Sequence, residues 1–218
     1  MSGTGASAFH AARAVGSTGS VLGVDIAERM LDRAREKAAQ EQLSNVDFRV
    51  ADMTALDLPE ASFDAVVIVF GIFFAPDMVA QVRALARLVR PSGVLAVTTW
   101  GPRLFEPLYT PFLEDVRALR PGMDEYRPWD RLASAEDAAT LMRAAGLARV
   151  AVTAELGRER LARPEDWWTI ARGTGLRWFI DQLDPASAEA LRAESIRRAR
   201  DVASIETNVV YCIASPSL

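Results

Sequence analysis

The stretch from Val21 to Asp25 constrains the fold of this chain more than any other. It reads Val-Leu-Gly-Val-Asp, a dense apolar run closed by a carboxylate, and a helical pattern begins directly after it. Such a short run is typical of a strand buried on both faces of a parallel sheet. In these sheets ligands lie beyond the carboxyl ends of the strands. Asp25 is therefore placed to accept hydrogen bonds from both hydroxyls of a ribose.

Two neighbouring stretches support this interpretation. Gly3-Thr4-Gly5 lies upstream and has the composition of a glycine turn, while a second apolar strand ends downstream in Ala51-Asp52-Met53. One carboxylate for a ribose and another for a base predict a cofactor that contains a nucleoside. The alternative at this point is that Asp25 merely caps the helix that follows it.

Helical and strand patterns alternate from residue 6 to residue 100, with the two strands 46–50 and 63–70 in succession. The predicted helices are 6–15, 27–42 and 77–90, and the predicted strands are 21–25, 46–50, 63–70 and 94–100. This alternation predicts an α/β fold, a Rossmann-like and mainly parallel sheet with right-handed crossovers and helices on both faces.

The pattern changes after Trp100. Two stretches rich in aromatic and helical residues, about 101–132 and 157–204, are interpreted as cap insertions in a single domain spanning 1–218. Between them, Ser134 opens a helix through a capping box, and 150–156 forms a strand. A final strand is expected at 206–214.

Composition excludes several classes of function. The net charge of −4 argues against general binding to nucleic acid, which needs a basic face. A single histidine and a single cysteine exclude a multi-histidine metal site and an internal disulfide. No apolar run is long enough for a membrane span, and no secretory signal is evident, so a cytoplasmic location is the default expectation.

Taken in order, the motifs resemble those of the class I S-adenosylmethionine-dependent methyltransferases, nearest the ubiquinone/menaquinone-biosynthesis-like branch that acts on small molecules. The matching stretches are Gly3-Thr-Gly5-Ala6, Gly23-Val-Asp25-Ile26, Met30-Leu31, Ala51-Asp52-Met53, Phe63-Asp64, Phe70-Gly71 and Arg90-Pro-Ser-Gly93. The resemblance implies S-adenosyl-L-methionine as cofactor. It also implies a set of cofactor-binding residues: Gly3, Thr4, Gly5, Asp25, Ile26, Met30, Asp52, Met53 and Phe70.

One departure from the family pattern is serious. The family begins with a central strand just before the glycine turn, and this chain begins inside the turn, so an N-terminal strand is predicted to be missing from a shortened chain. Strands 21–25 and 66–70 should flank its place. They could pair directly, a second copy could fill the position in an exchanged homodimer, or the position could stay open.

The substrate is expected to be a small and rather apolar molecule because the insertions are rich in aromatic residues. The candidate contacts are Trp100, Phe105, Tyr109, Trp129 and Trp167. The alternative is that Trp167, Ile170 and Ala171 form the core face of a cap helix. No residue is identified as a catalytic base.

Two other functions stay open from the sequence. Gly3-x-Gly5-x-x-Ala8 with Asp25 downstream also fits the fingerprint of an NAD(P)-dependent oxidoreductase. The second alternative is an inactive relative that serves as a binding or dimerisation module.

Overall fold

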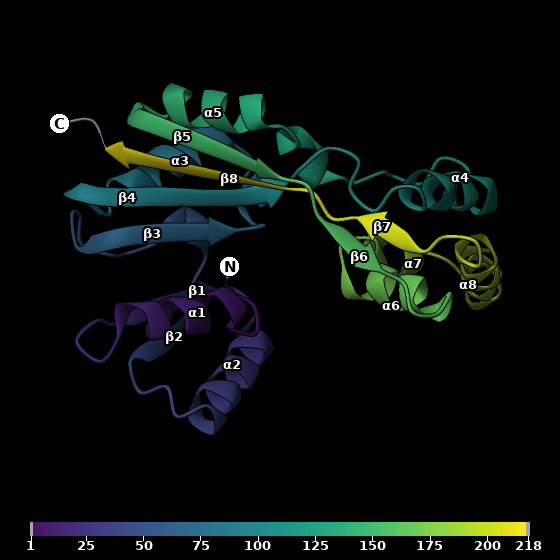
Figure 1. The fold of residues 1–218 in the computed structure, drawn as a ribbon, viewed down its shortest axis with the longest axis horizontal. Helices are drawn as coiled ribbons and strands as arrows, with labels where there is room; N and C mark the ends of the chain where they lie inside the picture. The colour runs from purple at the N-terminus through teal and green to yellow at the C-terminus, as the bar shows by residue number, and fades with distance from the viewer. Residues whose placement is uncertain (1, 217–218) are drawn as a thin grey trace. The chain divides into compact units, whose positions relative to one another are not determined.

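The computed structural model describes residues 2–216, which form two compact units (Figure 1). Unit 1 consists of Met1–Thr98, Leu141–Ala151 and Ile213–Leu218, and unit 2 of Thr99–Thr140 and Val152–Cys212. The two predicted insertions, 101–132 and 157–204, both fall within unit 2. The interpretation of 1–218 as one methyltransferase domain remains a prediction.

Helices and strands follow one another from residue 6 to residue 100 in the order that the sequence predicts. In chain order they are α1 (Ala6–Val15), β1 (Val21–Asp25), α2 (Glu28–Gln40), β2 (Val46–Val50), β3 (Phe63–Val69), α3 (Met78–Ala86), β4 (Val89–Trp100), α4 (Tyr109–Leu119), α5 (Ala135–Ala144), β5 (Leu147–Glu155), β6 (Arg158–Arg160), α6 (Glu165–Gly173), α7 (Arg177–Ile180), α8 (Pro185–Ala199), β7 (Ser204–Glu206) and β8 (Val209–Pro216).

The strands of the predicted Rossmann-like fold form two separate sheets. β1 and β2 pair in parallel, and a second sheet has the order β3-β4-β8-β5. β3 and β4 are also parallel, whereas the arrow of β8 runs opposite to its neighbours in Figure 1. The strands are therefore mainly parallel with one antiparallel member, a mixture that is common in large α/β sheets.

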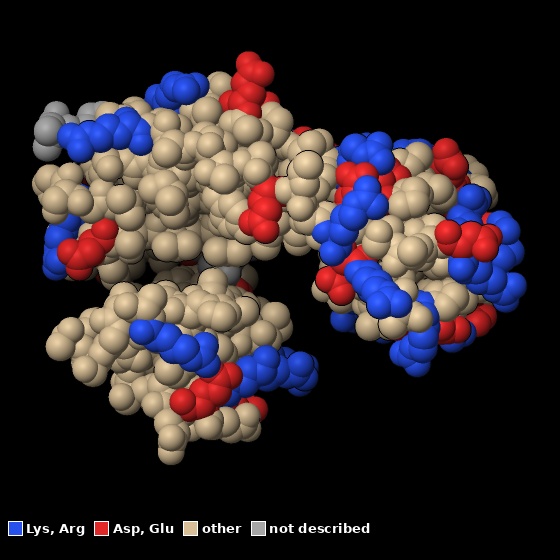
Figure 2. All heavy atoms as spheres, viewed as in Figure 1, with Lys and Arg blue, Asp and Glu red and all other residues tan. Residues whose placement is uncertain are grey.

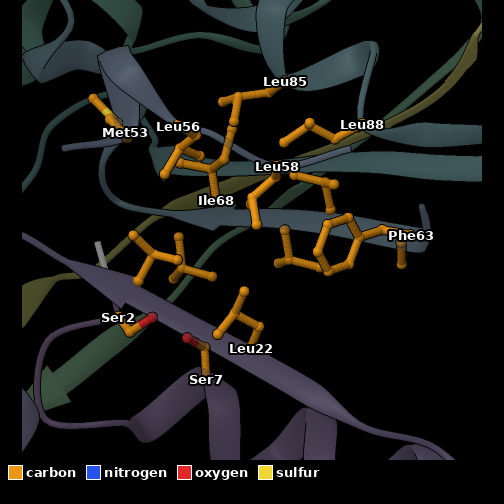
Figure 3. A pocket seen from close by; sticks show the side chains of 15 residues that line it. Ser2, Ser7, Leu22, Met53, Leu56, Leu58, Phe63, Ile68, Leu85 and Leu88 are labelled. Atoms are coloured by element: carbon orange, nitrogen blue, oxygen red, sulfur yellow. The ribbon is translucent and has the colours of Figure 1, made fainter. Parts of the chain in front are cut away.

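A cavity of about 140 Å³ lies between β1 and β3, which do not pair with each other. Leu22 and Val24 line it from β1, and residues 65–69 line it from β3. Figure 3 shows the hydroxyls of Ser2 and Ser7 on the side of the cavity that β1 lines, and a group of leucines on the side that β3 lines. Direct pairing of the two strands, the first of the three expected arrangements, is therefore wrong within residues 2–216.

Ser2 already occupies one end of this cavity as a strand residue would. Its backbone N–H donates to the carbonyl oxygen of Val24 at 2.7 Å, a rung of the kind that a parallel neighbour of β1 would make. Figure 2 shows the hollow between the part that carries β1 and β2 and the part that carries β3.

Phe9 packs the helix that follows the glycine turn against its neighbours. Phe9, Ala34 and Ala38 form a buried cluster that joins α1 to α2, and the Phe9 ring meets the Phe48 ring of β2 edge-on at 6.1 Å. Gly5 has φ of 91°, and a Cβ there would lie 2.4 Å from the Phe9 ring. A side chain at residue 5 would therefore be strained and would also collide.

Three predicted boundaries are wrong. The helix predicted for 77–90 ends at Ala86, and Val89 already pairs with Phe63 in the β3–β4 ladder. The stretch 157–204 is not wholly helical because β6 pairs antiparallel with β7. The predicted last strand is interrupted between β7 and β8 at Asn208, whose backbone carbonyl accepts from the Gly101 N–H at 2.7 Å and whose side-chain oxygen accepts from the Gly157 N–H at 3.1 Å.

Candidate functional site

Asp25 ends β1 and organises the backbone on both sides of it. Its Oδ2 accepts from the Gly3 N–H at 2.8 Å and its Oδ1 accepts from the Ala27 N–H at 2.9 Å. Each oxygen of a carboxylate has two lone pairs, so each retains capacity for one further donor. The carboxylate thus holds the glycine turn, with half-buried Thr4 in it, against the end of β1.

Apolar side chains flank this carboxylate. Ile26 follows Asp25 directly and is 69% exposed, an unusual exposure for an isoleucine, and Met30 is 40% exposed. The Cε atom of Met30 lies 3.8 Å from where a Cβ on Gly3 would be, so Met30 sits over the turn. The structure therefore brings Gly3, Asp25 and Met30 together as the sequence predicts.

Asp52 lies at the corresponding end of β2, next to Asp25. The Ala51 N–H donates to the Asp25 carbonyl at 3.0 Å, which continues the β1–β2 pairing to this point. Asp52 then caps the short 3₁₀ helix η1 (Met53–Ala55), and its Oδ1 accepts from both the N–H and the hydroxyl of Thr54 at 2.8 Å. These hydrogen bonds, the backbone one first, lower the pKa of Asp52 and favour its charged form. Its Oδ2 takes no hydrogen bond within residues 2–216.

Phe70 follows the end of β3, a strand that lines the side of the cavity opposite β1. Its backbone is left-handed, with φ of 50°, and its N–H donates a hydrogen bond to the carbonyl oxygen of Thr98 at 2.9 Å. Val69 beside it lines the cavity together with Met53. Phe70 is thus placed at the predicted strand end, but the contacts described above join only Gly3, Asp25, Met30 and the Asp52 loop.

The predicted substrate residues all belong to unit 2, where most of them are core. Trp167 is 1% exposed, Phe105 6% and Trp129 7%. The Trp167 ring packs edge-on against Phe105 and Phe112, with centroids 6.0 and 6.1 Å apart. This packing agrees with the alternative that Trp167 lies on the core face of a cap helix, here α6.

Tyr109 and Trp129 form a polar pair inside the same unit. The Trp129 Nε1–H donates to the Tyr109 hydroxyl at 3.1 Å. Burial raises the pKa of Tyr109 because it disfavours the tyrosinate, while the hydrogen bond from Trp129 opposes the shift in part. Trp100, the remaining candidate, is partly exposed and packs on Phe105 at 6.0 Å.

The raised pKa of Tyr109 predicts a loss of stability at high pH. A group whose pKa is higher in the folded than in the unfolded state adds stability that is lost as pH rises. Unit 2 should therefore become less stable as pH rises above the ordinary tyrosine pKa of 10.0, because the unfolded chain loses the Tyr109 proton before the folded protein does. Ultraviolet titration of tyrosinate absorbance in the wild type and in Tyr109→Phe measures this. Titration of Tyr109 at or below the ordinary value in folded protein would contradict it.

One buried polar residue was not singled out from the sequence. Gln81 of α3 is 6% exposed, and its Nε2 donates to the Met53 carbonyl at 2.7 Å. The signal that was available is a glutamine on the otherwise apolar inner face of the predicted helix 77–90. Its partner could not be identified because the two residues lie in different elements.

The described residues, 2–216, lack the features of two other kinds of site. They contain no cluster of three or more His, Cys, Asp or Glu side chains suited to a metal ion. No helix among them combines the length and apolarity that crossing a membrane requires.

Residues 1–93 of the chain are similar to known methyltransferases. Residues 1–93 match a family described as "Methyltransferase domain". The demethylmenaquinone methyltransferase of Lactococcus lactis is 34% identical over 108 residues, which is 49% of this chain and 42% of that protein. The aklanonic acid methyltransferase of a Streptomyces species is 37% identical over 97 residues, or 44% of each protein. The matched part of the chain thus spans less than half the length of these curated relatives.

Solved structures extend the likeness to the whole fold. The YcgJ protein of Bacillus subtilis has a TM-score of 0.63 at 17% identity, covering 100% of this chain and 90% of that one. A SAM-dependent methyltransferase from Aquifex aeolicus has a TM-score of 0.52 at 21% identity, covering 69% and 70%. At these identities the likeness establishes the Rossmann-like fold.

Proposed function

We propose that this chain is a class I S-adenosylmethionine-dependent methyltransferase of the quinone-biosynthesis type and that it methylates a small-molecule acceptor; the similarity of residues 1–93 to such enzymes supports the proposal. The observation that carries the proposal is the arrangement of Asp25 and Asp52 at the ends of two adjacent parallel strands. Neither carboxylate forms an ion pair within residues 2–216, so both are available to neutral donors of a ligand.

The side chains at these strand ends fit a nucleoside. Asp25 has spare lone pairs on both oxygens, which suits two adjacent ribose hydroxyls. Asp52 offers Oδ2, an acceptor with no partner in the described residues, which suits the amino group of adenine. Exposed Ile26 is an apolar surface of the kind that a flat base covers. We assign Gly3, Thr4, Gly5, Met30, Met53 and Phe70 to the same proposed site.

S-adenosylmethionine supplies a methyl group that is already activated for transfer, so the protein mainly contributes positioning and exclusion of water. The proposed role of Asp25 is to hold the ribose while keeping the glycine turn in place. Asp52 orients the base. A general base is needed only when the acceptor must lose a proton, and none of the residues described above is assigned that role.

The acceptor is proposed to be a rather apolar small molecule. The relatives methylate demethylmenaquinone and aklanonic acid according to their names. Trp100 and Tyr109 are the partly exposed members of the aromatic set and are proposed to contact the acceptor; Phe105, Trp129 and Trp167 are proposed to support them from the core. A screen of acceptors by mass spectrometry tests this proposal. Turnover confined to highly charged acceptors would contradict it.

Replacing Asp25 with alanine should weaken binding of S-adenosylhomocysteine by about 1.5–3 kcal/mol, or roughly 10- to 150-fold, because hydrogen bonds to a charged group are lost. Calorimetric titration of the wild type and the variant measures the difference. Circular dichroism of both proteins checks that the fold survives.

Asp32→Ala is the matched control. Asp32 is an exposed aspartate on nearby α2 that pairs only locally with Arg35, and its removal should leave affinity unchanged. Equal affinity of folded Asp25→Ala and the wild type would show that Asp25 does not hold the ribose. Absence of any binding by the wild type would contradict the proposed function itself.

A further inference from the structure

The side chain of Gln81 is polar and buried, and no role in the proposed methyl transfer has been assigned to it above. It lies on α3 between apolar neighbours, and Val82 beside it is 0% exposed. Burying an amide costs free energy unless its hydrogen bonds are made. Its bond to the Met53 carbonyl, at 2.7 Å, connects α3 to the loop that follows β2.

This bond clamps one particular peptide unit. The Met53 carbonyl and the Thr54 N–H belong to the same planar peptide group. Gln81 Nε2 donates to that carbonyl, and the Thr54 N–H donates to Asp52 Oδ1 at 2.8 Å. The peptide group is therefore held by a hydrogen bond at each end. Its orientation sets the direction from which the Thr54 N–H approaches the Asp52 carboxylate.

The clamp leaves one oxygen of Asp52 available. Oδ1 already accepts the N–H and the hydroxyl of Thr54, so the carboxylate cannot rotate freely, and Oδ2 remains as an acceptor. An ionised carboxylate accepts hydrogen bonds and donates none. It therefore selects a purine that carries an amino group at C6 over one that carries a carbonyl.

We propose that Gln81 is a positioning residue for base recognition, holding the Met53–Thr54 peptide so that Asp52 Oδ2 points at the 6-amino group of the cofactor's adenine. The proposal rests on the proposed function because it requires the nucleoside to lie at Asp52. A role confined to packing would be served as well by an apolar residue on this face of α3, and such a residue would avoid the burial of an amide.

The test compares two ligands. S-adenosylhomocysteine carries the 6-amino group, and its inosine analogue carries a carbonyl there. Gln81→Met keeps the length of the side chain and removes the donor. We expect affinity for S-adenosylhomocysteine to fall by about 3- to 10-fold, as for the loss of one hydrogen bond. Affinity for the inosine analogue should stay nearly constant, so the preference between the two ligands shrinks.

Two controls separate positioning from stability. Val82→Ala removes a buried neighbour on the same helix and should destabilise the protein while leaving the preference between the two ligands intact. In an Asp52→Ala background, Gln81→Met should cause no further loss of affinity, because the two changes act through one contact.

Hydrogen exchange gives a readout without ligand. In folded Gln81→Met, the Thr54 amide should exchange faster than in the wild type, since its peptide is no longer held at the carbonyl end. If Gln81→Met fails to fold, Gln81→Leu serves the same comparison because leucine also lacks a donor.

An unchanged preference between the two ligands in a folded variant overturns the role of Gln81 and leaves the proposed function standing. If the wild type binds neither ligand, the proposed function and the role of Gln81 both fail.

Discussion

A strand-forming segment joined ahead of Met1 should raise the free energy of unfolding of unit 1 by about 3–5 kcal/mol. The cavity between β1 and β3 is lined by backbone edges and apolar side chains such as Leu22 and Val66. A strand there would add hydrogen bonds to both edges and bury apolar surface on both sides. These gains should exceed the entropy lost by ordering the added residues.

The geometry at Ser2 indicates how such a segment should be joined. Its N–H already donates to the Val24 carbonyl, so residues placed directly before it would enter the cavity parallel to β1. Five or six valines and isoleucines match the length of β1, which is 5 residues. Urea unfolding followed by circular dichroism measures the change.

A segment of equal length with alternating prolines is the control, because proline cannot donate to a ladder. Equal stability of the two extended proteins would mean that the cavity does not accept a strand. Protection from hydrogen exchange in residues 21–25 and 65–69 of the valine-containing form would locate the gain at the predicted edges.

Trp167→Ala should destabilise unit 2 by about 3–5 kcal/mol, the usual cost of removing a large buried aromatic side chain. Trp167 is 1% exposed and contacts the rings of Phe105 and Phe112. Its removal would leave a cavity at the centre of these aromatic contacts. All five tryptophans lie within unit 2, so tryptophan fluorescence in a urea titration reports on that unit alone.

Trp178→Ala is the matched control because Trp178 is 47% exposed and packs mainly on the exposed ring of Tyr126. Its loss should cost less than about 1 kcal/mol. If Trp167→Ala instead unfolds like the wild type but raises the KM of an acceptor found in the screen, Trp167 contacts substrate and is not a core residue.

Local pattern was sufficient to predict the elements of unit 1. The density of apolar residues in 21–25 and 63–70 is set by burial on both faces of a sheet, so each strand could be identified without its partner. The positions of Asp25 and Asp52 follow from the same logic. Parallel neighbouring strands end at the same edge, so residues that follow two such strands are expected to lie side by side.

Element boundaries were less predictable where tertiary contacts compete with local preference. The helix predicted for 77–90 ends at Ala86 because Val89 is already paired with β3. The last strand breaks near Asn208, whose side-chain amide also donates to the Pro102 carbonyl at 2.9 Å. These partners lie far away in the sequence, and no local pattern of residues announces them.

The sequence by itself determined the order of strands and helices from α1 to β4 and the carboxylates at the strand ends. Only the tertiary structure decided that β8 lies between β4 and β5, that Trp167 is core and that Gln81 bonds Met53. The physical reason is the distance along the sequence over which the deciding interactions act. Periodicity and strand-end placement depend on neighbours within a few residues, whereas side-chain partners such as Gln81 and Met53 meet only when whole elements pack.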